Sequence, residues 1–87
     1  MTNDIAIARV TGVRRSRYIE FDYIHGGTDL MVELIMPVEA LKTFCAERRC
    51  EICAGSPEAR EALMRLDRPS HPESSSFASI PIREPSK

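Results

Sequence analysis

The chain has 87 residues, enough for one small domain. Its 12 basic and 13 acidic residues leave a net charge of −1, which excludes the strongly positive surface of a typical nucleic-acid or membrane-surface protein. No apolar run approaches the roughly 20 residues that cross a bilayer. The first four residues carry an acid and no base, and three cysteines do not suit a secreted disulfide framework. We therefore expect a cytoplasmic protein that binds neither nucleic acid nor membrane.

The first half of the chain predicts strands. Residues 5–10 place β-branched side chains at alternate positions, a pattern typical of a strand, before Thr11 and Gly12 interrupt it. In residues 17–24 the apolar Ile19, Phe21 and Tyr23 share one face and the acids between them share the other. Such alternation indicates a strand with one buried and one wet face.

A glycine pair at residues 26–27 supplies the positive φ angles of a reversal. The next run, residues 29–36, again alternates. Its inward side chains are expected to be Leu30, Val32, Leu34 and Met36, and its outward side chains Met31, Glu33 and Ile35. The two runs and the turn predict a β-hairpin.

Two helices are expected after the hairpin. Following Pro37, apolar residues recur at helical spacing at Val38, Leu41, Phe44 and Cys45, which predicts a helix across the inner face of the sheet. Residues 50–53 read as a short extended segment. Ser56 and Pro57 suit the N-cap and first position of a second helix, which ends at Arg68-Pro69.

These elements predict an α+β fold: a small antiparallel three-stranded sheet, centred on the hairpin and packed by one or two helices. We expect a single domain over residues 1–68. Residues 69–87 are rich in Ser and Pro and are expected to be a flexible, disordered tail. Phe77, Ile80 and Ile82 in that tail are either anchors that order on a partner or incidental. An open edge strand would permit a homodimer.

The three cysteines have metal-ligand spacing, Cys45-x4-Cys50-x2-Cys53, like the first three ligands of plant-type ferredoxins. A Cys3His zinc site would need His25 or His71 as its fourth ligand. However, Cys45 lies on the apolar face of the expected helix, where a free cysteine is usually a small buried hydrophobe. We expect no metal and no cofactor, and keep a small metal or redox carrier as an alternative.

The outward face of the hairpin combines acids with apolar side chains. Nothing that accompanies the acids suggests catalysis: there is no nucleophile with an orienting histidine and no glycine-rich phosphate loop, so we do not expect an enzyme. The acids are either simply solvated or part of a contact surface, and the apolar residues beside them suit a contact surface. The predicted partner-binding residues are Tyr18, Glu20, Asp22, Ile24, Met31, Glu33 and Ile35.

Several short motifs, taken in order, resemble one known family. They are Glu20-Phe21-Asp22, Gly26-Gly27, Val32-Glu33-Leu34 with Pro37, and Phe44-Cys45. Over residues 9–50 the chain resembles the small assembly or accessory subunit of multicomponent bacterial phenol hydroxylases. Cys50, Cys53 and the Ser/Pro-rich tail are not part of that pattern.

The resemblance implies an accessory component of a phenol 2-monooxygenase system. Such a subunit binds the diiron oxygenase component and aids formation of its active, iron-loaded state without taking part in turnover. A coupling or regulatory subunit of the same monooxygenase is the first alternative, and the carrier built on Cys45, Cys50 and Cys53 is the second.

Overall fold

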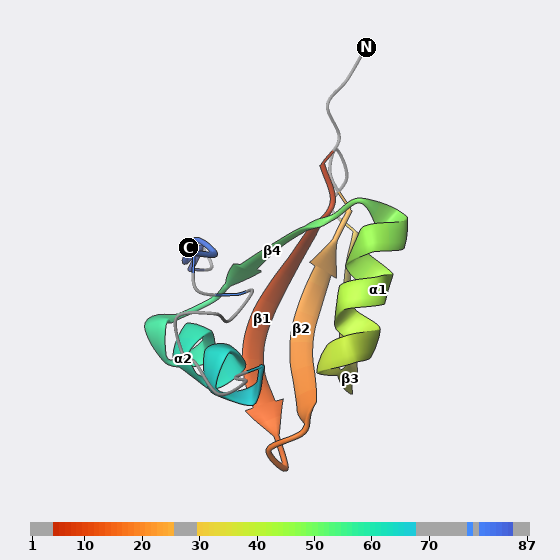
Figure 1. Ribbon diagram of the computed structural model, residues 1–87. Coiled ribbons are helices and arrows are strands. Elements are labelled where there is room, and N and C mark those ends of the chain that lie inside the picture. The colour runs from red at the N-terminus through yellow and green to blue at the C-terminus, as the bar shows by residue number, and fades with distance from the viewer. Residues whose placement is uncertain (1–4, 26–29, 68–76, 78, 85–87) are drawn as a thin grey trace.

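The computed structural model describes residues 5–25, 30–67, 77 and 79–84. Their strands form one mixed sheet in the order β3-β2-β1-β4 (Figure 1). The strands are β1 (Ile7–Arg14), β2 (Tyr18–Ile24), β3 (Met31–Pro37) and β4 (Glu51–Ala54). The α+β class and the antiparallel pairing of β2 with β3 are confirmed, whereas the purely antiparallel three-stranded sheet was wrong. The predicted glycine turn at residues 26–27 lies outside the described residues.

The fourth strand follows from the path of the chain over the sheet. β1 and β3 each pair antiparallel with β2, so they run in the same direction. Helix α1 (Val38–Arg48) then carries the chain from the β3 edge to the opposite edge, where β4 joins β1 in parallel. Residues 50–53 alone predict an extended segment, but only this crossover decides that the segment pairs with β1.

β1 also runs further than its sequence pattern predicts. Its pairing with β2 shifts register between Val10 and Gly12, and the Thr11 hydroxyl donates a hydrogen bond to the carbonyl of Glu20 at 3.2 Å. This irregularity lets the strand continue through the two residues that break the alternation. β1 and β2 are joined by a tight turn in which Arg15 and Ser16 both have a φ of 53°.

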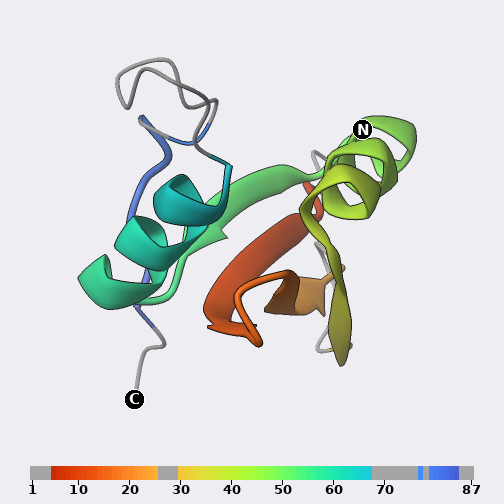
Figure 2. The same cartoon turned by 60° about the horizontal axis from the view of Figure 1, so that its bottom comes forward.

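Both helices begin where the sequence predicts. Pro37 is the N-cap of α1, and Ser56 caps α2 (Pro57–Leu66) by accepting a hydrogen bond from the Ala59 amide at 3.1 Å. The two helices lie on the same side of the sheet (Figures 1 and 2). The prediction that a helix covers the inner face is therefore confirmed, and α2 covers the β1 end of that face.

One core lies between the helices and the sheet. The ring of Phe44 in α1 packs edge-on against Phe21 and Tyr23, with centroids 5.7 and 5.3 Å away. The fully buried members of the core come from β1, β2, β4, both helices and the segment beyond α2, and Leu34 and Met36 of β3 pack against them half-buried. Its buried members are Ala8, Val10, Ile19, Phe21, Leu41, Cys45, Ala54, Ala59, Leu63 and Phe77.

The described residues beyond α2 pack against the same domain. Phe77 is only 2% exposed, and Lys42 Nζ lies 5.8 Å from the centre of its ring. The Ala54 amide donates to the Pro81 carbonyl at 2.9 Å, and the Arg83 amide donates to Ala54 at 2.6 Å. These contacts hold Phe77 and residues 81–83 against the domain, and a flexible tail over residues 69–87 as a whole stays a prediction. Residues 68–76 lie outside the described part, so a boundary at residue 68 stays a prediction.

Candidate protein-binding face of the sheet

Cross-strand register brings the seven predicted partner-binding residues to one side of the sheet. β2 and β3 pair Tyr18 with Pro37, Glu20 with Ile35, Asp22 with Glu33, and Ile24 with Met31. Side chains alternate along a strand, so these residues point away from the face that carries Ile19 and Phe21. Neither helix in the described part of the chain covers their side, which we call the open face (Figure 2).

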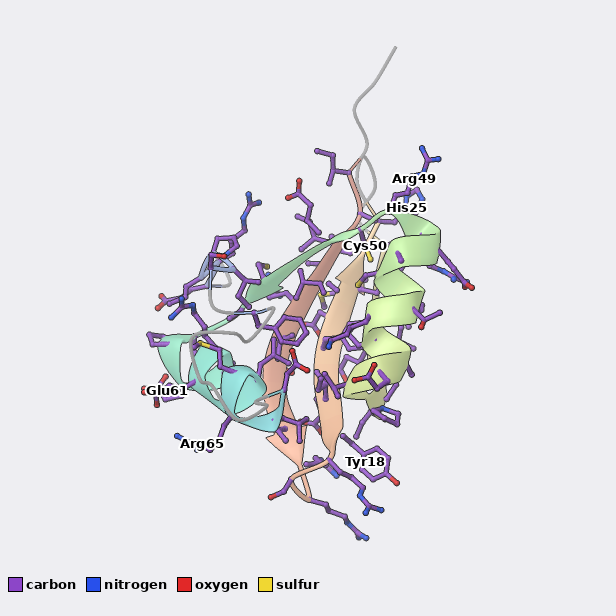
Figure 3. The ribbon with its side chains drawn as sticks, in the orientation of Figure 1. Tyr18, His25, Arg49, Cys50, Glu61 and Arg65 are labelled. Atoms are coloured by element: carbon purple, nitrogen blue, oxygen red, sulfur yellow. The ribbon has the colours of Figure 1, made fainter. Side chains whose placement is uncertain are left out.

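The apolar part of the open face is concentrated on β3. Met31 and Ile35 are 51% and 50% exposed, although both belong to a regular strand. Tyr18 and Ile24 are half-buried, and Figure 3 shows Tyr18 at one end of the sheet and His25 at the other. Met31 lies opposite Ile24, and Glu33 separates it from Ile35 along β3. Large exposed apolar side chains gathered on one face are typical of surfaces that contact another molecule.

Two residues predicted to point inward are less covered than expected. Leu30 precedes β3 and is 59% exposed, so it is not part of the buried core. Val32 pairs with Tyr23 on the helix side of the sheet but is still 40% exposed. α1 therefore leaves the β3 edge partly uncovered on both sides, and the exposed apolar surface continues around that edge.

The predicted acidic patch is largely neutralised within the chain. Arg9 of β1 donates to Asp22 at 3.1 Å, and the two side chains are only 17% and 12% exposed. Arg14 also pairs with Glu20, but this ion pair is more exposed. Among the described residues, Glu33 forms no ion pair. The charge that the open face presents to a partner is thus mainly that of Glu33.

Sequence reasoning missed Arg9, although a signal for it exists. Arg9 lies between Ala8 and Val10, both fully buried, so alternation alone places it on the outward face. What the sequence does not reveal is the register that sets Arg9 opposite Asp22. The pair ties β1 to β2 through Asp22, and a role of Asp22 in binding a partner stays a prediction.

The open face is concave as well as partly apolar. A shallow hollow of about 460 Å³ crosses the three antiparallel strands. It is lined by Thr11, Arg14, Glu20, Phe21, Asp22, Glu33, Leu34 and Ile35. Glu33 and Ile35 stand at its β3 side, so a side chain entering the hollow would meet both a carboxylate and an aliphatic wall.

The three cysteines do not converge on one point. Cys45 is buried in the core under α1, and burial, together with its hydrogen bond to Cys50, raises the pKa of the Cys45 thiol. Cys53 pairs with Arg9 in register, and its pKa is raised by burial. Figure 3 shows Cys50 at the end of α1, where the chain turns into β4.

The described residues do not form a metal-binding group. No three His, Cys, Asp or Glu side chains among them are placed to hold a metal ion. His25 is exposed, with its ring 6.5 Å from Tyr23, and His71 lies outside the described residues. The carrier built on the cysteines therefore lacks a site in this part of the chain.

These features define a small α+β protein with an uncovered, partly apolar sheet face, the kind of surface at which proteins associate. Within the described residues, no helix is long and apolar enough to span a membrane. The sequence model of the phenol hydroxylase subunit family matches residues 5–53, which run from β1 through α1 into β4 and make up more than half of the chain. The chain belongs to the phenol hydroxylase subunit family. No curated protein and no solved structure matches it significantly.

Proposed function

We propose that this protein is a non-catalytic assembly subunit of a multicomponent phenol hydroxylase. It binds the diiron oxygenase component and aids formation of the iron-loaded, active enzyme. The observation that carries the proposal is the open face, where Met31 and Ile35 are exposed on a sheet of a phenol hydroxylase subunit. An exposed apolar face on a member of this family is suited to binding the oxygenase.

The open-face residues have different roles in this proposal. Met31 and Ile35 are the apolar anchors, with Tyr18 and Ile24 at the two ends of β2 extending the contact. Glu33 supplies the charge. Burying one exposed Met or Ile side chain stabilises a complex by about 1.5–3 kcal/mol at most, so two anchors suit a reversible complex.

Asp22 and Glu20 act differently from Glu33. Each is paired with an arginine of β1, so each holds the platform together while its carboxylate stays compensated. Removal of Asp22 would leave the partly buried Arg9 without its partner, which costs free energy of folding. Loss of binding in an Asp22 variant would therefore not identify a contact.

The experiment that tests the proposal is capture of the untagged oxygenase component by this chain, with iron-free and iron-loaded oxygenase compared. We expect preferential capture of the iron-free form, and higher activity when iron is added to the captured oxygenase than to oxygenase alone. Met31→Ser with Ile35→Ser should abolish capture. Ile82→Ser is the matched control, because Ile82 is 42% exposed but lies beside β4.

The alternatives give different results in the same experiment. A coupling subunit would raise the activity of fully iron-loaded oxygenase, whereas an assembly subunit leaves it unchanged or lowers it. A cysteine-based carrier would contain iron or zinc in stoichiometric amount when purified. Capture of neither form of the oxygenase would contradict the proposal.

A further inference from the structure

We propose that the free edge of β3 takes up an extended segment of the oxygenase as an additional β-strand. The segment has apolar side chains at alternate positions and a basic side chain that faces Glu33. This inference rests on the proposed function and specifies how the partner is held: by backbone hydrogen bonds to β3 and by side-chain contacts to the open face.

The register shows which backbone groups are available. Among the strands of the described residues, β3 ends the sheet and pairs only with β2. Just before β3, the His25 amide donates to the Leu30 carbonyl at 3.3 Å. In an antiparallel pair, hydrogen-bonded and non-hydrogen-bonded positions alternate. The backbone groups of Val32, Leu34 and Met36 therefore point toward β2, and those of Met31, Glu33 and Ile35 point away from the sheet.

The two edges of the sheet differ in whether described residues of the chain pair with them. At β4, the chain's own residues 81–83 pair with Ala54 through two backbone hydrogen bonds, and Ile82 forms a parallel bridge with it. At the outer edge of β3, no described residue forms such backbone pairing. Edge strands in soluble proteins are usually protected by lysines, prolines, bulges or cover. β3 pairs in unbroken register, and its single proline, Pro37, is its last residue.

At the β3 edge the same three residues offer backbone groups and side chains to one added strand. The residues with outward-pointing backbone groups, Met31, Glu33 and Ile35, are also those whose side chains lie on the open face. An added strand would thus hydrogen-bond to these three residues and place its own alternate side chains beside them. Since Glu33 has no ion pair among the described residues, a Lys or Arg at the central position complements it.

A second copy of the chain suits this edge less well. In a two-fold antiparallel pairing centred on Glu33, the two Glu33 carboxylates would lie directly opposite each other, and like charges in that position are destabilising. A register that sets Glu33 against Ile35 avoids the repulsion but leaves both carboxylates uncompensated. The oxygenase segment is therefore the assigned occupant, and the homodimer is an outcome that the test detects.

The test is hydrogen exchange of the full chain, free and in complex with iron-free oxygenase, resolved at single amides. In the free chain the amides of Met31, Glu33 and Ile35 should exchange at rates near those of an unstructured peptide. In the complex we expect each to slow by about 100-fold or more, as hydrogen-bonded strand amides do. The amides of Val32 and Leu34, already bonded to β2, serve as internal controls.

A matched pair of variants separates backbone from side chain. Glu33→Ala and Glu33→Pro both remove the carboxylate, but only proline removes the N–H, and an edge strand tolerates proline where the N–H faces outward. Glu33→Ala should weaken the complex by about two- to fivefold, the range of an exposed ion pair. Glu33→Pro should weaken it by about tenfold more, because the partner's carbonyl loses its donor.

Each outcome decides between the assignments. If the complex forms and the three amides exchange at unchanged rates, strand addition is wrong although the proposed function stands. If no complex forms, the proposed function fails and this inference fails with it. If the amides are already protected in the free chain, and sedimentation gives twice the 9.8 kDa of one chain, the occupant is a second copy and our assignment is wrong.

Discussion

Replacement of Phe77 by alanine should destabilise the protein severely, although Phe77 lies in a stretch whose composition predicts disorder. Phe77 is 2% exposed and belongs to the core that includes residues of both helices. Truncation of a buried Phe to Ala costs about 3–5 kcal/mol, from lost transfer free energy and the cavity left behind. We expect about 3 kcal/mol, since a segment that joins the sheet at one edge can shift into the cavity.

That loss is large for a chain of this size. Natural domains retain about 0.05–0.15 kcal/mol per residue, so the whole protein has about 4–13 kcal/mol to lose. Urea unfolding followed by circular dichroism measures the change in the free energy of unfolding. The slope of that free energy against urea concentration should be the same in the variant and the parent, as expected when only stability changes. Ile82→Ala is the control, because Ile82 lies in the same stretch but is 42% exposed and should lose less than about 1 kcal/mol.

A small effect of the Phe77 substitution would refute this reasoning. If Phe77→Ala loses no more free energy of unfolding than Ile82→Ala, Phe77 is not part of the core. The stretch would then be a disordered tail, as its Ser and Pro content predicts.

Three further predictions concern the turn, the thiols and the ion pairs of α1. Ser16→Gly should stabilise the protein by about 1 kcal/mol in urea unfolding, because Ser16 has a φ of 53°, which glycine adopts without strain; a loss of stability would contradict this. Iodoacetamide should modify Cys50 first, since burial shields Cys45 and Cys53 and raises the pKa of both; equal rates by mass spectrometry would refute the placement. The pKa of Lys42 is raised above 10.5, chiefly by its hydrogen bond to Asp67, the C-cap of α2. The stability that charged Lys42 contributes is therefore complete below pH 10.5 and is lost as the pH rises through the raised pKa. In Lys42→Met the free energy of unfolding should fall less between pH 9 and 12 than it does in the parent, as urea unfolding of both proteins across that pH range will show.

The local half of the fold could be predicted from the sequence. Alternation along residues 17–24 and 31–36 is a property of neighbouring side chains, and it identified the hairpin, its two faces and the seven residues of the open face. The cap of α2 was predictable for the same reason, since Ser56 bonds to an amide three residues away. Patterns of this kind need no knowledge of what lies across the sheet.

What the sequence could not reveal depends on pairs of residues far apart in the chain. The place of β4 beside β1 and the cover over Phe77 are set by the crossover through α1 and by the packing of both helices. The Arg9–Asp22 pair joins residues 13 positions apart and gives Asp22 a structural contact that the sequence pattern does not reveal. The spacing of Cys45, Cys50 and Cys53 is short and the first two are hydrogen-bonded to each other, yet Cys53 lies in β4 and does not join them in a metal-binding group.

The fold itself points to β3 as the contact element. α1 and α2 occupy one face of the sheet, and residues 81–83 close the β4 edge. The described residues leave one face and one edge uncovered, and these meet along β3. There Met31, Glu33 and Ile35 present side chains to the open face and backbone groups to the free edge, so a single added strand would satisfy both. A partner that contacted the face alone would leave these backbone groups to water, which is why amide exchange along β3, more than any loss of affinity, distinguishes the two modes of binding.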